Sequence, residues 1–495
     1  MSEGIRNVVI AGGGTAGWMT AAAMAVTFGG RIRVTLVESD AIPTVGVGEA
    51  TVPSIFTFHR LLKIAEPDFL KATMGTFKLG INFEGWKTPQ TDYFHSFGDT
   101  GQGCWAAGFQ HFWARGQREG IAAEYGEYCL ELQAAKRNQF NLTSEAKLNY
   151  AYHLDAGLYA KYLRGVAEKH SARRIEGSIE QVILNPDSGY IDALRLADGQ
   201  RIEGDLFIDC TGFRGLLIEE ALKAGYDDWS HYLPCNRAVA LQTEATEPPR
   251  PYTRAIAHDF GWQWRIPLQH RTGNGIVFCD KYVSEDEATA TLLANVTGEH
   301  RTDPRLIKFT TGQRQKYWLK NCVAVGLSSG FIEPMESTSI HMIQQAIMWL
   351  LLMFPNDRID PSVVEDYNQR IRREVLYIRD FIVLHYHLTE RRGKPFWDYL
   401  ATMPIPETLQ HRLDTFKESA QVFKPQDDFF AENSWIQVMM GQGLMPESYH
   451  PIVDNMSKQE LTHFLNVIRQ QVQTGLSKML PHEAFVERYM EIRTR

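Results

Sequence analysis

The hydrophobic pattern of the first forty residues predicts a strand, a tight turn, a helix and a second strand. Residues 7–11 form an apolar run of strand length, residues 18–26 are apolar without a helix breaker, and residues 33–37 form another short apolar run. Strands that alternate with helices are typical of a parallel sheet covered by helices. The pattern therefore predicts an α/β fold.

Glycines occupy the turn between the first strand and the helix. Gly12, Gly14 and Gly17 form the pattern G-x-G-x-x-G, in which the backbone closely approaches a pyrophosphate at the helix N-terminus. Glu38 ends the next strand, at the spacing typical of an acid that binds a ribose. A lone glycine pattern can be a structural turn, but this context predicts a dinucleotide site.

Later segments extend the same pattern. An amphipathic helix is predicted over 154–170, a strand pair over 175–184 and 190–196, and buried strands over 204–212 and 321–327. No second glycine fingerprint follows in the sequence. We therefore expect one dinucleotide site, with any reduced cofactor made elsewhere.

The segment 330–354 predicts a helix whose start can hold an anion. A Ser/Thr cluster at 337–339 offers N-cap residues, and residues 340–354 are largely apolar. Free N–H groups and the positive end of the helix dipole attract a small anion, although Glu333 and Glu336 lie beside them. The structural alternative is a capping carboxylate before a buried helix.

Beyond residue 355 the pattern is helical. Asp360 followed by Pro361 marks one helix start, and Ser457 with Glu460 forms a capping box before another helix. The stretch 434–446 between them is apolar and rich in methionine. A helical C-terminal part is therefore expected.

Lys78 interrupts an apolar, strand-like segment at 77–83. Side-chain alternation places it on the same side as Gly80 and Asn82. A lysine in this setting can lie at a strand edge with its ammonium in water. If it is buried instead, its pKa falls and its amine becomes reactive.

Aromatic residues form two further patterns. Trp262 and Trp264 point to one face of a predicted strand that Pro267 ends, so they form either one rigid wall or part of a core. His95 and Phe97 lie in another aromatic-rich segment, where the alternative for His95 is a core histidine.

Composition narrows the possible functions. The 495 residues are 44% hydrophobic, enough for a large core, and the net charge of −8 without a basic, aromatic cluster argues against a nucleic-acid face. The six cysteines are scattered without metal-ligand spacing, which is typical of reduced thiols in a cytoplasmic protein. Glycines break the apolar run 8–26, so no membrane span is expected there.

Several motifs together closely resemble the flavin-dependent tryptophan halogenase family. They are the glycine turn at 12–18, the loop G-V-G-E-A-T at 46–51, Lys78, the tryptophan motif at 262–267 and P-M-E-S-T at 334–338. The match is collinear over nearly the whole chain. It implies an α/β fold with an FAD-binding Rossmann-like domain of the flavin monooxygenase-like type, a mixed insertion and a helical C-terminal substrate-binding part.

The resemblance also implies a domain organisation. Residues 1–355 would form a discontinuous FAD-binding domain, with a substrate-side insertion over about 90–150 and a β-rich segment over about 220–300. Residues 356–495 would form the helical substrate-binding part.

In the family, reduced FAD reacts with O2 to a flavin hydroperoxide, chloride or bromide attacks its distal oxygen, and hypohalous acid forms. The resemblance assigns Lys78 to halogen delivery and Glu336 to its assistance, and it places the halide at Thr338 and Ser339. The family usually has glycine at the last position, so halide preference is open. A separate flavin reductase that supplies FADH2 is expected, as is a homodimer.

The flavin contacts implied by the resemblance extend beyond the glycine turn. The expected cofactor-binding residues are Gly12, Gly14, Thr15, Ala16, Gly17, Glu38, Gly48, Ala50, Ile179, Leu327 and Ile340.

The substrate implied by the resemblance is an electron-rich, indole-like arene. His95 and Phe97 match the positions that sandwich the ring, while Trp262 and Trp264 match the barrier between substrate and flavin. Trp435 stands where tryptophan-specific members have a tyrosine pair that holds the amino-acid end. Free tryptophan is therefore not the expected substrate.

Two other functions fit the same nucleotide fold. An FAD-dependent aromatic monooxygenase would hydroxylate its ring without halide, and a flavin-binding module would bind FAD without turnover.

Overall fold

The computed structural model describes residues 4–42, 49–142 and 148–491. The chain forms two compact units, each built from three segments. Unit 1 contains Met1–Gly75, Leu154–Asn236 and Lys308–Leu376, and unit 2 contains Thr76–His153, Arg237–Ile307 and Tyr377–Arg495. The domain boundaries expected from the sequence remain a prediction.

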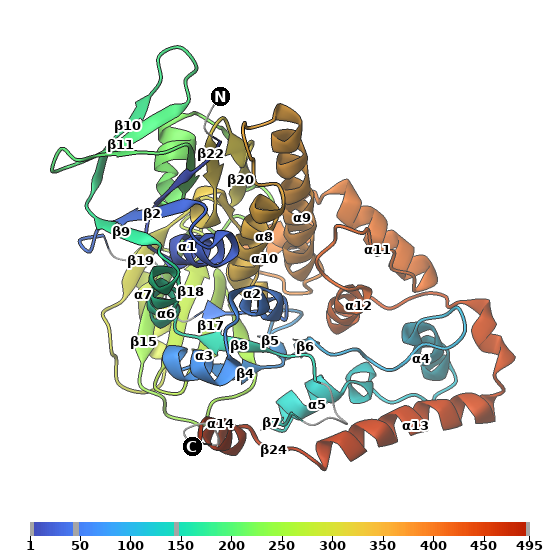
Figure 1. Ribbon diagram of the computed structural model, residues 1–495. Coiled ribbons are helices and arrows are strands. Elements are labelled where there is room, and N and C mark those ends of the chain that lie inside the picture. The colour runs from blue at the N-terminus through green and yellow to red at the C-terminus, as the bar shows by residue number, and fades with distance from the viewer. Residues whose placement is uncertain (1–3, 43–48, 143–147, 492–495) are drawn as a thin grey trace. The chain divides into compact units, whose positions relative to one another are not determined.

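Unit 1 contains a six-stranded sheet in the order β21-β22-β13-β1-β2-β9 (Figure 1). All neighbouring strands are parallel except the pair β21 and β22. The strands are β1 (Asn7–Ala11), β2 (Arg33–Glu38), β9 (Arg173–Glu176), β13 (Leu206–Asp209), β21 (Trp318–Leu319) and β22 (Cys322–Ala324). The predicted α/β fold is confirmed.

Three helices of unit 1 lie where the sequence predicts them, and two more, α2 and α3, lie where it predicts no helix. The helix expected over 18–26 is longer, and the one expected over 154–170 is slightly shorter. The helices are α1 (Thr15–Phe28), α2 (Ile55–Leu62), α3 (Glu66–Thr73), α6 (Ala156–Lys169) and α8 (Ser339–Leu352). Most of α1 is buried, and it packs against α6, which explains why its sequence is apolar on every face.

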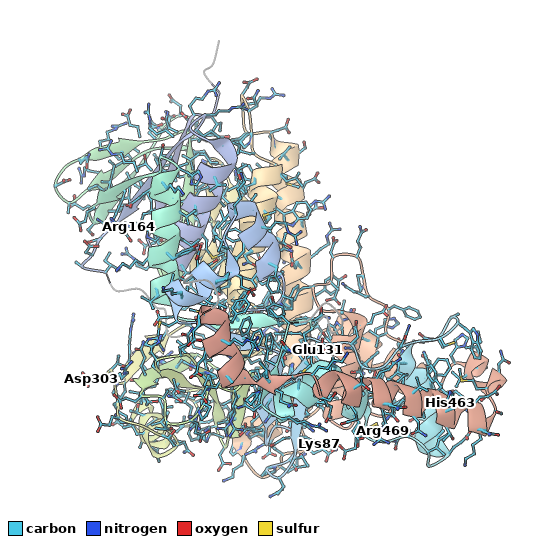
Figure 2. All side chains as sticks on the ribbon, turned by 60° about the horizontal axis from the view of Figure 1, so that its bottom comes forward. Lys87, Glu131, Arg164, Asp303, His463 and Arg469 are labelled. Carbon is cyan, nitrogen blue, oxygen red and sulfur yellow. The ribbon has the colours of Figure 1, made fainter. Side chains whose placement is uncertain are left out.

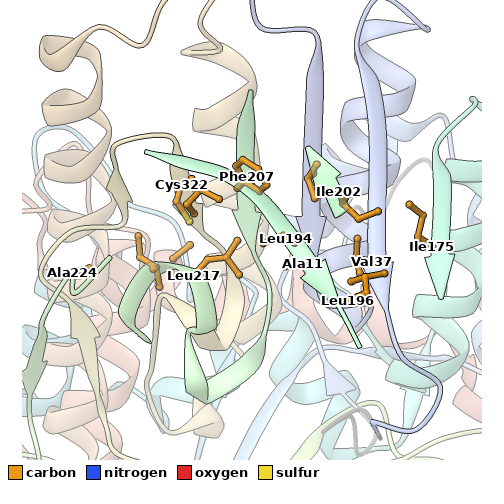
Figure 3. Close-up of a cluster of buried hydrophobic side chains, with 14 residues drawn as sticks. Ala11, Val37, Ile175, Leu194, Leu196, Ile202, Phe207, Leu217, Ala224 and Cys322 are labelled. Carbon is orange, nitrogen blue, oxygen red and sulfur yellow. The ribbon is translucent and has the colours of Figure 1, made fainter. Parts of the chain in front are cut away.

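An apolar core lies on one side of this sheet (Figure 3). It includes Val9, Phe207 and Cys322 from the parallel strands and Leu194 from β11 (Ile191–Leu196). Strand β11 pairs antiparallel with β10 (Ile179–Leu184), and this ribbon projects from the unit in Figure 1.

The predicted strand pair is therefore confirmed, but its first part is wrong at Ile175. This residue belongs to β9 and pairs with Val37 of β2, because its apolar side chain fits the main sheet.

Unit 2 is organised around a seven-stranded sheet in the order β19-β15-β18-β17-β16-β5-β6. Its strands are β5 (Gly80–Glu84), β6 (Asp92–Ser96), β15 (Arg237–Thr243), β16 (Thr253–His258), β17 (Gly261–Pro267), β18 (Thr272–Phe278) and β19 (Arg305–Lys308). The pair β16 and β5 is parallel, whereas β15 to β18, β18 to β17, β17 to β16 and β5 to β6 are antiparallel.

Helices make up most of the last part of the chain, as the sequence predicts. Helix α13 begins after the predicted capping box, in which the Ser457 hydroxyl accepts from the Glu460 N–H and the Glu460 carboxylate accepts from the Ser457 N–H. The helices of unit 2 are α4 (Phe109–Arg118), α5 (Leu130–Lys136), α7 (Glu285–Ala294), α10 (Pro395–Thr402), α11 (Glu407–Ser419), α12 (Glu432–Gly441), α13 (Lys458–Leu476) and α14 (His482–Glu491), and α9 (Pro361–His387) joins the two units along the chain.

Candidate active site

The glycine turn at the end of β1 is shaped by close backbone contacts. Gly12 has a φ of 102°, and a Cβ there would lie 2.3 Å from the carbonyl oxygen of Cys210. A Cβ on Gly17 would lie 1.9 Å from the carbonyl oxygen of Gly12. Both positions therefore require glycine, one for the turn and one for the packing of α1 onto β1.

Gly14 has a different reason to be glycine. A Cβ added to it would meet no described atom within 4 Å, so the space beside it is open. Gly14 is the N-cap of α1, which has neither a side-chain cap nor an acidic residue in its first turn. The N–H groups of Thr15 and Ala16 begin this helix, and such a start suits a phosphate.

Glu38 lies beside the turn at the end of β2. A Cβ on Gly13 would lie 1.5 Å from its Oε2, and the Arg174 Nε donates to its Oε1 at 2.6 Å. This hydrogen bond raises the pKa of Arg174 and fixes the orientation of the carboxylate. An oriented carboxylate at this position suits a ribose hydroxyl.

The other expected flavin residues are distributed over several elements of unit 1. Ala50 and Ile340 are buried, whereas Ile179 and Leu327 are half-buried. Gly326 brings the Leu327 turn to the start of α1, because a Cβ on it would lie 2.7 Å from the Ala16 Cβ. Gly48 lies outside the described residues.

The strand at 206–209 ends in a turn that its own aspartate holds. The Asp209 Oδ1 accepts from the N–H and hydroxyl of Thr211, at 2.9 and 2.7 Å. Its Oδ2 accepts from the N–H groups of Leu217 and Ile218, both at 2.8 Å. Asp209 is fully buried, so its carboxylate serves as a structural cap.

The predicted anion site begins α8. Residues Pro334–Glu336 form a 3-10 turn, Ser337 has a φ of 59°, and Thr338 is the N-cap. The helix start is confirmed, but the Thr338 side chain makes no cap hydrogen bond. Its buried hydroxyl has no hydrogen-bond partner in the parts of the chain that the structure describes. A buried hydroxyl of this kind suits a small anion.

The two glutamates of this segment are buried, whereas Ser339, the second candidate halide residue, is only half-buried. Glu333 and Glu336 are fully buried, and Ser339 is half-buried at the first position of α8. Full burial keeps both carboxyl groups out of contact with solvent.

Lys78 is fully buried in unit 2, at the end of β4 (Thr76–Lys78). This excludes a position at an exposed strand edge. Its Nζ lies 5.1 Å from the centroid of the Phe97 ring, within the range of a cation–π contact. The Phe97 N–H donates to the Leu79 carbonyl oxygen at 2.9 Å, so the two candidate residues are held in register.

A neutral histidine lies near Lys78. The Thr76 hydroxyl donates to the Pro267 carbonyl oxygen at 2.9 Å, so it accepts from the His153 Nδ1 at 3.1 Å. The His153 Nε2 lies 3.0 Å from the Thr253 hydroxyl. Burial and, next, the nearby Lys78 charge hold the pKa of His153 well below its usual range. His153 is therefore uncharged, and the sequence analysis missed it because its partners are distant in the chain.

The candidate ring-binding residues lie in an aromatic cluster of unit 2. The His95 ring is 5.4 Å from Phe381 and 6.1 Å from Phe430, and these two phenylalanines stack at 3.7 Å. His95 is buried and Phe97 is half-buried. The Trp435 ring meets Phe381 edge to face at 4.8 Å. The cluster therefore joins His95 to Trp435.

The indole N–H of Trp435 is hydrogen-bonded to another side chain of the protein. It is 1% exposed, and its indole N–H donates to the Asp428 Oδ2 at 3.2 Å. The Arg412 guanidinium lies 3.7 Å from the Trp435 ring centroid and donates to the same carboxylate at 2.8 Å. Trp435 thus presents packing surface and no spare hydrogen-bond donor.

Gln437 and Glu131 support the segment that carries Phe97, and no local sequence pattern marks either residue. The Gln437 Oε1 accepts from the Ser96 N–H at 2.8 Å, and its Nε2 donates to the Gly98 carbonyl oxygen at 3.0 Å. On the other side, a Cβ on Gly98 would lie 1.9 Å from the Glu131 Oε2. The Glu131 Oε1 accepts from the Asn149 N–H at 2.8 Å.

Trp262 and Trp264 lie on β17, as the sequence predicts. They are 1% and 8% exposed, and their ring centroids are 6.2 Å apart. A Cβ on Gly275 of the neighbouring strand would lie 2.0 Å from the Trp264 Cζ2. Glycine therefore makes room for one half of a rigid tryptophan pair.

No helix among the described residues is long and apolar enough to cross a membrane. No group of three or more His, Cys, Asp or Glu side chains in the same residues could hold a metal ion.

Two solved structures that are similar to this chain are flavin-dependent halogenases. Xcc4156 from Xanthomonas campestris is 52% identical with a TM-score of 0.96, and 98% of each chain is covered. BrvH from Brevundimonas sp. BAL3 is 41% identical with a TM-score of 0.94, over 98% of this chain and 99% of that one.

Sequence comparison agrees with the structural likeness. Tryptophan 6-halogenase ThaL from Streptomyces albogriseolus is 33% identical over 489 residues, which cover 91% of this chain and 92% of ThaL. The family model for tryptophan halogenase matches residues 7–458. The chain therefore belongs to the tryptophan halogenase family, whose members are flavin-dependent enzymes.

Proposed function

We propose that the protein is an FADH2-dependent halogenase of an indole-like arene. The observation that carries this proposal is Lys78, a fully buried amine beside the Phe97 ring. An amine at this position can hold an oxidised halogen next to an aromatic substrate. Relatives that share the fold, such as Xcc4156 and BrvH, are flavin-dependent halogenases.

The residues of unit 1 would hold the cofactor and the halide. The glycine turn and Glu38 fit the pyrophosphate and a ribose of FAD. When bound in its reduced form, FAD supplies the activation of O2 that oxidises chloride or bromide to hypohalous acid. Thr338 and Ser339 would bind the halide, because the first holds a buried hydroxyl and the second begins α8.

Lys78 and Glu336 would carry the transfer to the arene. Lys78 would hydrogen-bond the hypohalous acid or become a haloamine, which places the electrophilic halogen beside the ring. Glu336 would stabilise the cationic ring and take its proton, or polarise the oxidant together with Lys78. Full burial of both side chains excludes water, which would otherwise consume the oxidant.

The indole-like substrate class rests on the aromatic cluster around His95. Flat rings favour a flat, electron-rich partner, and ThaL is a tryptophan halogenase. Free tryptophan is a poorer candidate, because Trp435 directs its only polar side-chain atom to Asp428.

We further propose that a separate reductase supplies FADH2, that the protein forms a homodimer and that it is located in the cytoplasm.

The test is mass spectrometry of reactions with indole, indole derivatives and tryptophan. Each reaction contains FAD, a flavin reductase with NADH, O2 and either chloride, bromide or no halide. We expect halogenated indoles only with halide. Hydroxylated product without halide would identify a monooxygenase, and bound FAD without any product would identify a flavin-binding module.

Two variants test the assigned residues. Lys78→Ala should lower the halogenation rate by at least about a hundredfold, and Glu336→Gln should lower kcat more than it raises the arene KM. Lys87→Ala is the matched control, because this lysine forms a half-exposed ion pair with Glu390 at 3.3 Å. Halogenation by Lys78→Ala at the wild-type rate would refute the mechanism.

A further inference from the structure

His341 joins three helices of unit 1. It is the third residue of α8 and is 2% exposed. Its Nδ1 lies 2.8 Å from the hydroxyl of Ser54, which begins α2. Its Nε2 lies 2.7 Å from the Oε1 of Glu374 on α9. One buried imidazole thus contacts a polar side chain at each end.

The partners determine where the proton of this imidazole lies. The Glu374 Oε1 also accepts from the Gln345 Nε2, at 3.0 Å, so the carboxylate acts as an acceptor. An ionised carboxylate only accepts, so with Glu374 in that form the His341 Nε2 donates the hydrogen and the bond is charge-assisted. A bond of this kind in a buried setting fixes the ring orientation.

The other contact of the ring departs from ordinary helix capping. Ser54 is the N-cap of α2, but its hydroxyl makes no cap hydrogen bond to its own helix. The hydroxyl lies instead 2.8 Å from the His341 Nδ1, and it also donates to the Oε1 of Gln344, a second residue of α8, at 3.4 Å. A cap hydrogen bond from Ser54 would stabilise α2. Because the Ser54 hydroxyl contacts His341 of α8 instead, this contact is a specific link between the two helices.

The elements at both ends carry residues of the proposed site. Ser54 lies four residues after Ala50, a proposed flavin contact. Thr338, the N-cap of α8, and Ser339, its first residue, are the proposed halide residues, and they lie three and two residues before His341. Any shift of this turn would move the buried Thr338 hydroxyl and the N–H groups that begin the helix.

We propose that His341 is a positioning residue for the halide. It holds the start of α8 between Ser54 and Glu374, so that the anion-binding groups keep one geometry. This inference rests on the proposed function, since it assumes that the halide binds at Thr338 and Ser339.

Two substitutions separate the two contacts of the ring. His341→Gln places an amide near the Nε2 position and can keep the bond to Glu374, whereas His341→Asn places it near Nδ1 and can keep the bond to Ser54. We expect both contacts of His341, with Ser54 and with Glu374, to be needed to position the halide. Each variant should therefore raise the apparent KM for bromide by roughly tenfold, the usual effect of losing one charge-assisted or buried hydrogen bond. The arene KM stays at the wild-type value.

A second readout needs no turnover. A ligand that binds the folded state raises the melting temperature, so we expect bromide to raise it in the wild-type protein with FAD and to raise it much less in both variants. His59→Gln is the matched control, because His59 is also a buried histidine of unit 1, and its Nε2 lies 3.1 Å from the hydroxyl of Tyr159 on α6 and not at the start of α8. It should leave the bromide response intact.

The outcomes separate the two proposals. Absence of halide-dependent product from the wild-type protein would overturn the proposed function, whereas wild-type bromide responses in both His341 variants would overturn the role of His341 alone. If these variants do not fold, Ser54→Ala and Glu374→Gln replace them, with an expected several-fold rise in the bromide KM. Unchanged values in both would likewise refute the positioning role.

Discussion

Glu131 is a carboxyl group that the protein buries against the Phe97 segment, and it is labelled in Figure 2. Burial, the largest cause, raises its pKa from 4.5 to about 7, against the lowering effect of the Asn149 N–H. The folded protein therefore binds the proton more tightly than the unfolded chain does. The resulting stabilisation is complete below pH 4.5 and is lost as the pH rises through about 7.

The change Glu131→Gln should remove this pH dependence. The amide oxygen can still accept from Asn149, and no charge is buried above pH 7. At pH 8 the variant should exceed the wild-type protein in stability by on the order of 3 kcal/mol, and at pH 4.5 the two should be similar. Calorimetric melting at both pH values measures this difference.

Glu127→Gln is the control for this experiment. Glu127 lies four residues away and pairs with Arg469 at 2.5 Å, at a half-exposed position. Its replacement should leave the difference between the two pH values as it is in the wild-type protein. A wild-type pH dependence in Glu131→Gln would show that another group titrates.

Ser339 stands at a position where the resemblance to the family implies glycine. Ser339 is the first residue of α8, and its Cβ and hydroxyl are atoms that a glycine lacks. We expect Ser339→Gly to increase the ratio of brominated to chlorinated product by about tenfold, because a larger anion gains most from a removed Cβ. Competition between equal concentrations of the two halides measures the ratio, and an unchanged ratio would place the halide elsewhere.

Helix α12 fixes the end of β6 through two amide side chains. Gln437 bonds the backbone on both sides of Phe97, and Asn433 also donates to the Gly98 carbonyl oxygen, at 2.8 Å. The helix therefore acts as a support for a candidate ring-binding residue. The arrangement depends on a separation of more than 300 residues.

The change Gln437→Met should weaken this support. The buried Ser96 N–H would lose its acceptor, at a cost of about 1–3 kcal/mol. Because Phe97 lies between the two bonded residues, kcat/KM for the arene should fall about tenfold, while the bromide KM stays constant. Gln473→Met, which alters an exposed contact with Arg137, should leave both unchanged.

At the level of elements, local signals predicted the structure well. The capping box at Ser457 begins α13, and the Ser/Thr cluster begins α8. The strand-like segment 77–83 was harder to predict, because it breaks at Leu79 into two strands. The Leu79 N–H donates to the Pro251 carbonyl oxygen at 2.7 Å, and no local pattern reports such a distant partner.

For the whole molecule, the α/β class followed from alternating strands and helices, and the family followed from its motifs. The grouping of segments into two compact units could not be read from local patterns, because each unit combines three distant stretches of chain. The same reason explains the missed residues His153, Gln437 and His341. Each is an ordinary polar residue in the sequence, and its role comes from partners more than 30 residues away.

The strand order of the six-stranded sheet has a consequence for synthesis on the ribosome. Strand β1 lies between β2 and β13, and β22 follows β13 at the next position. A ribosome that adds about 5–20 residues per second needs on the order of tens of seconds to pass from β1 to β22. The nascent chain exposes an unpaired edge of β1 until β13 is made, and then an unpaired edge of β13 until β22 is made, about two-thirds of the way along the 495 residues. Because an unpaired strand edge is a site of aggregation, we expect this part of the chain to be most prone to aggregate during synthesis.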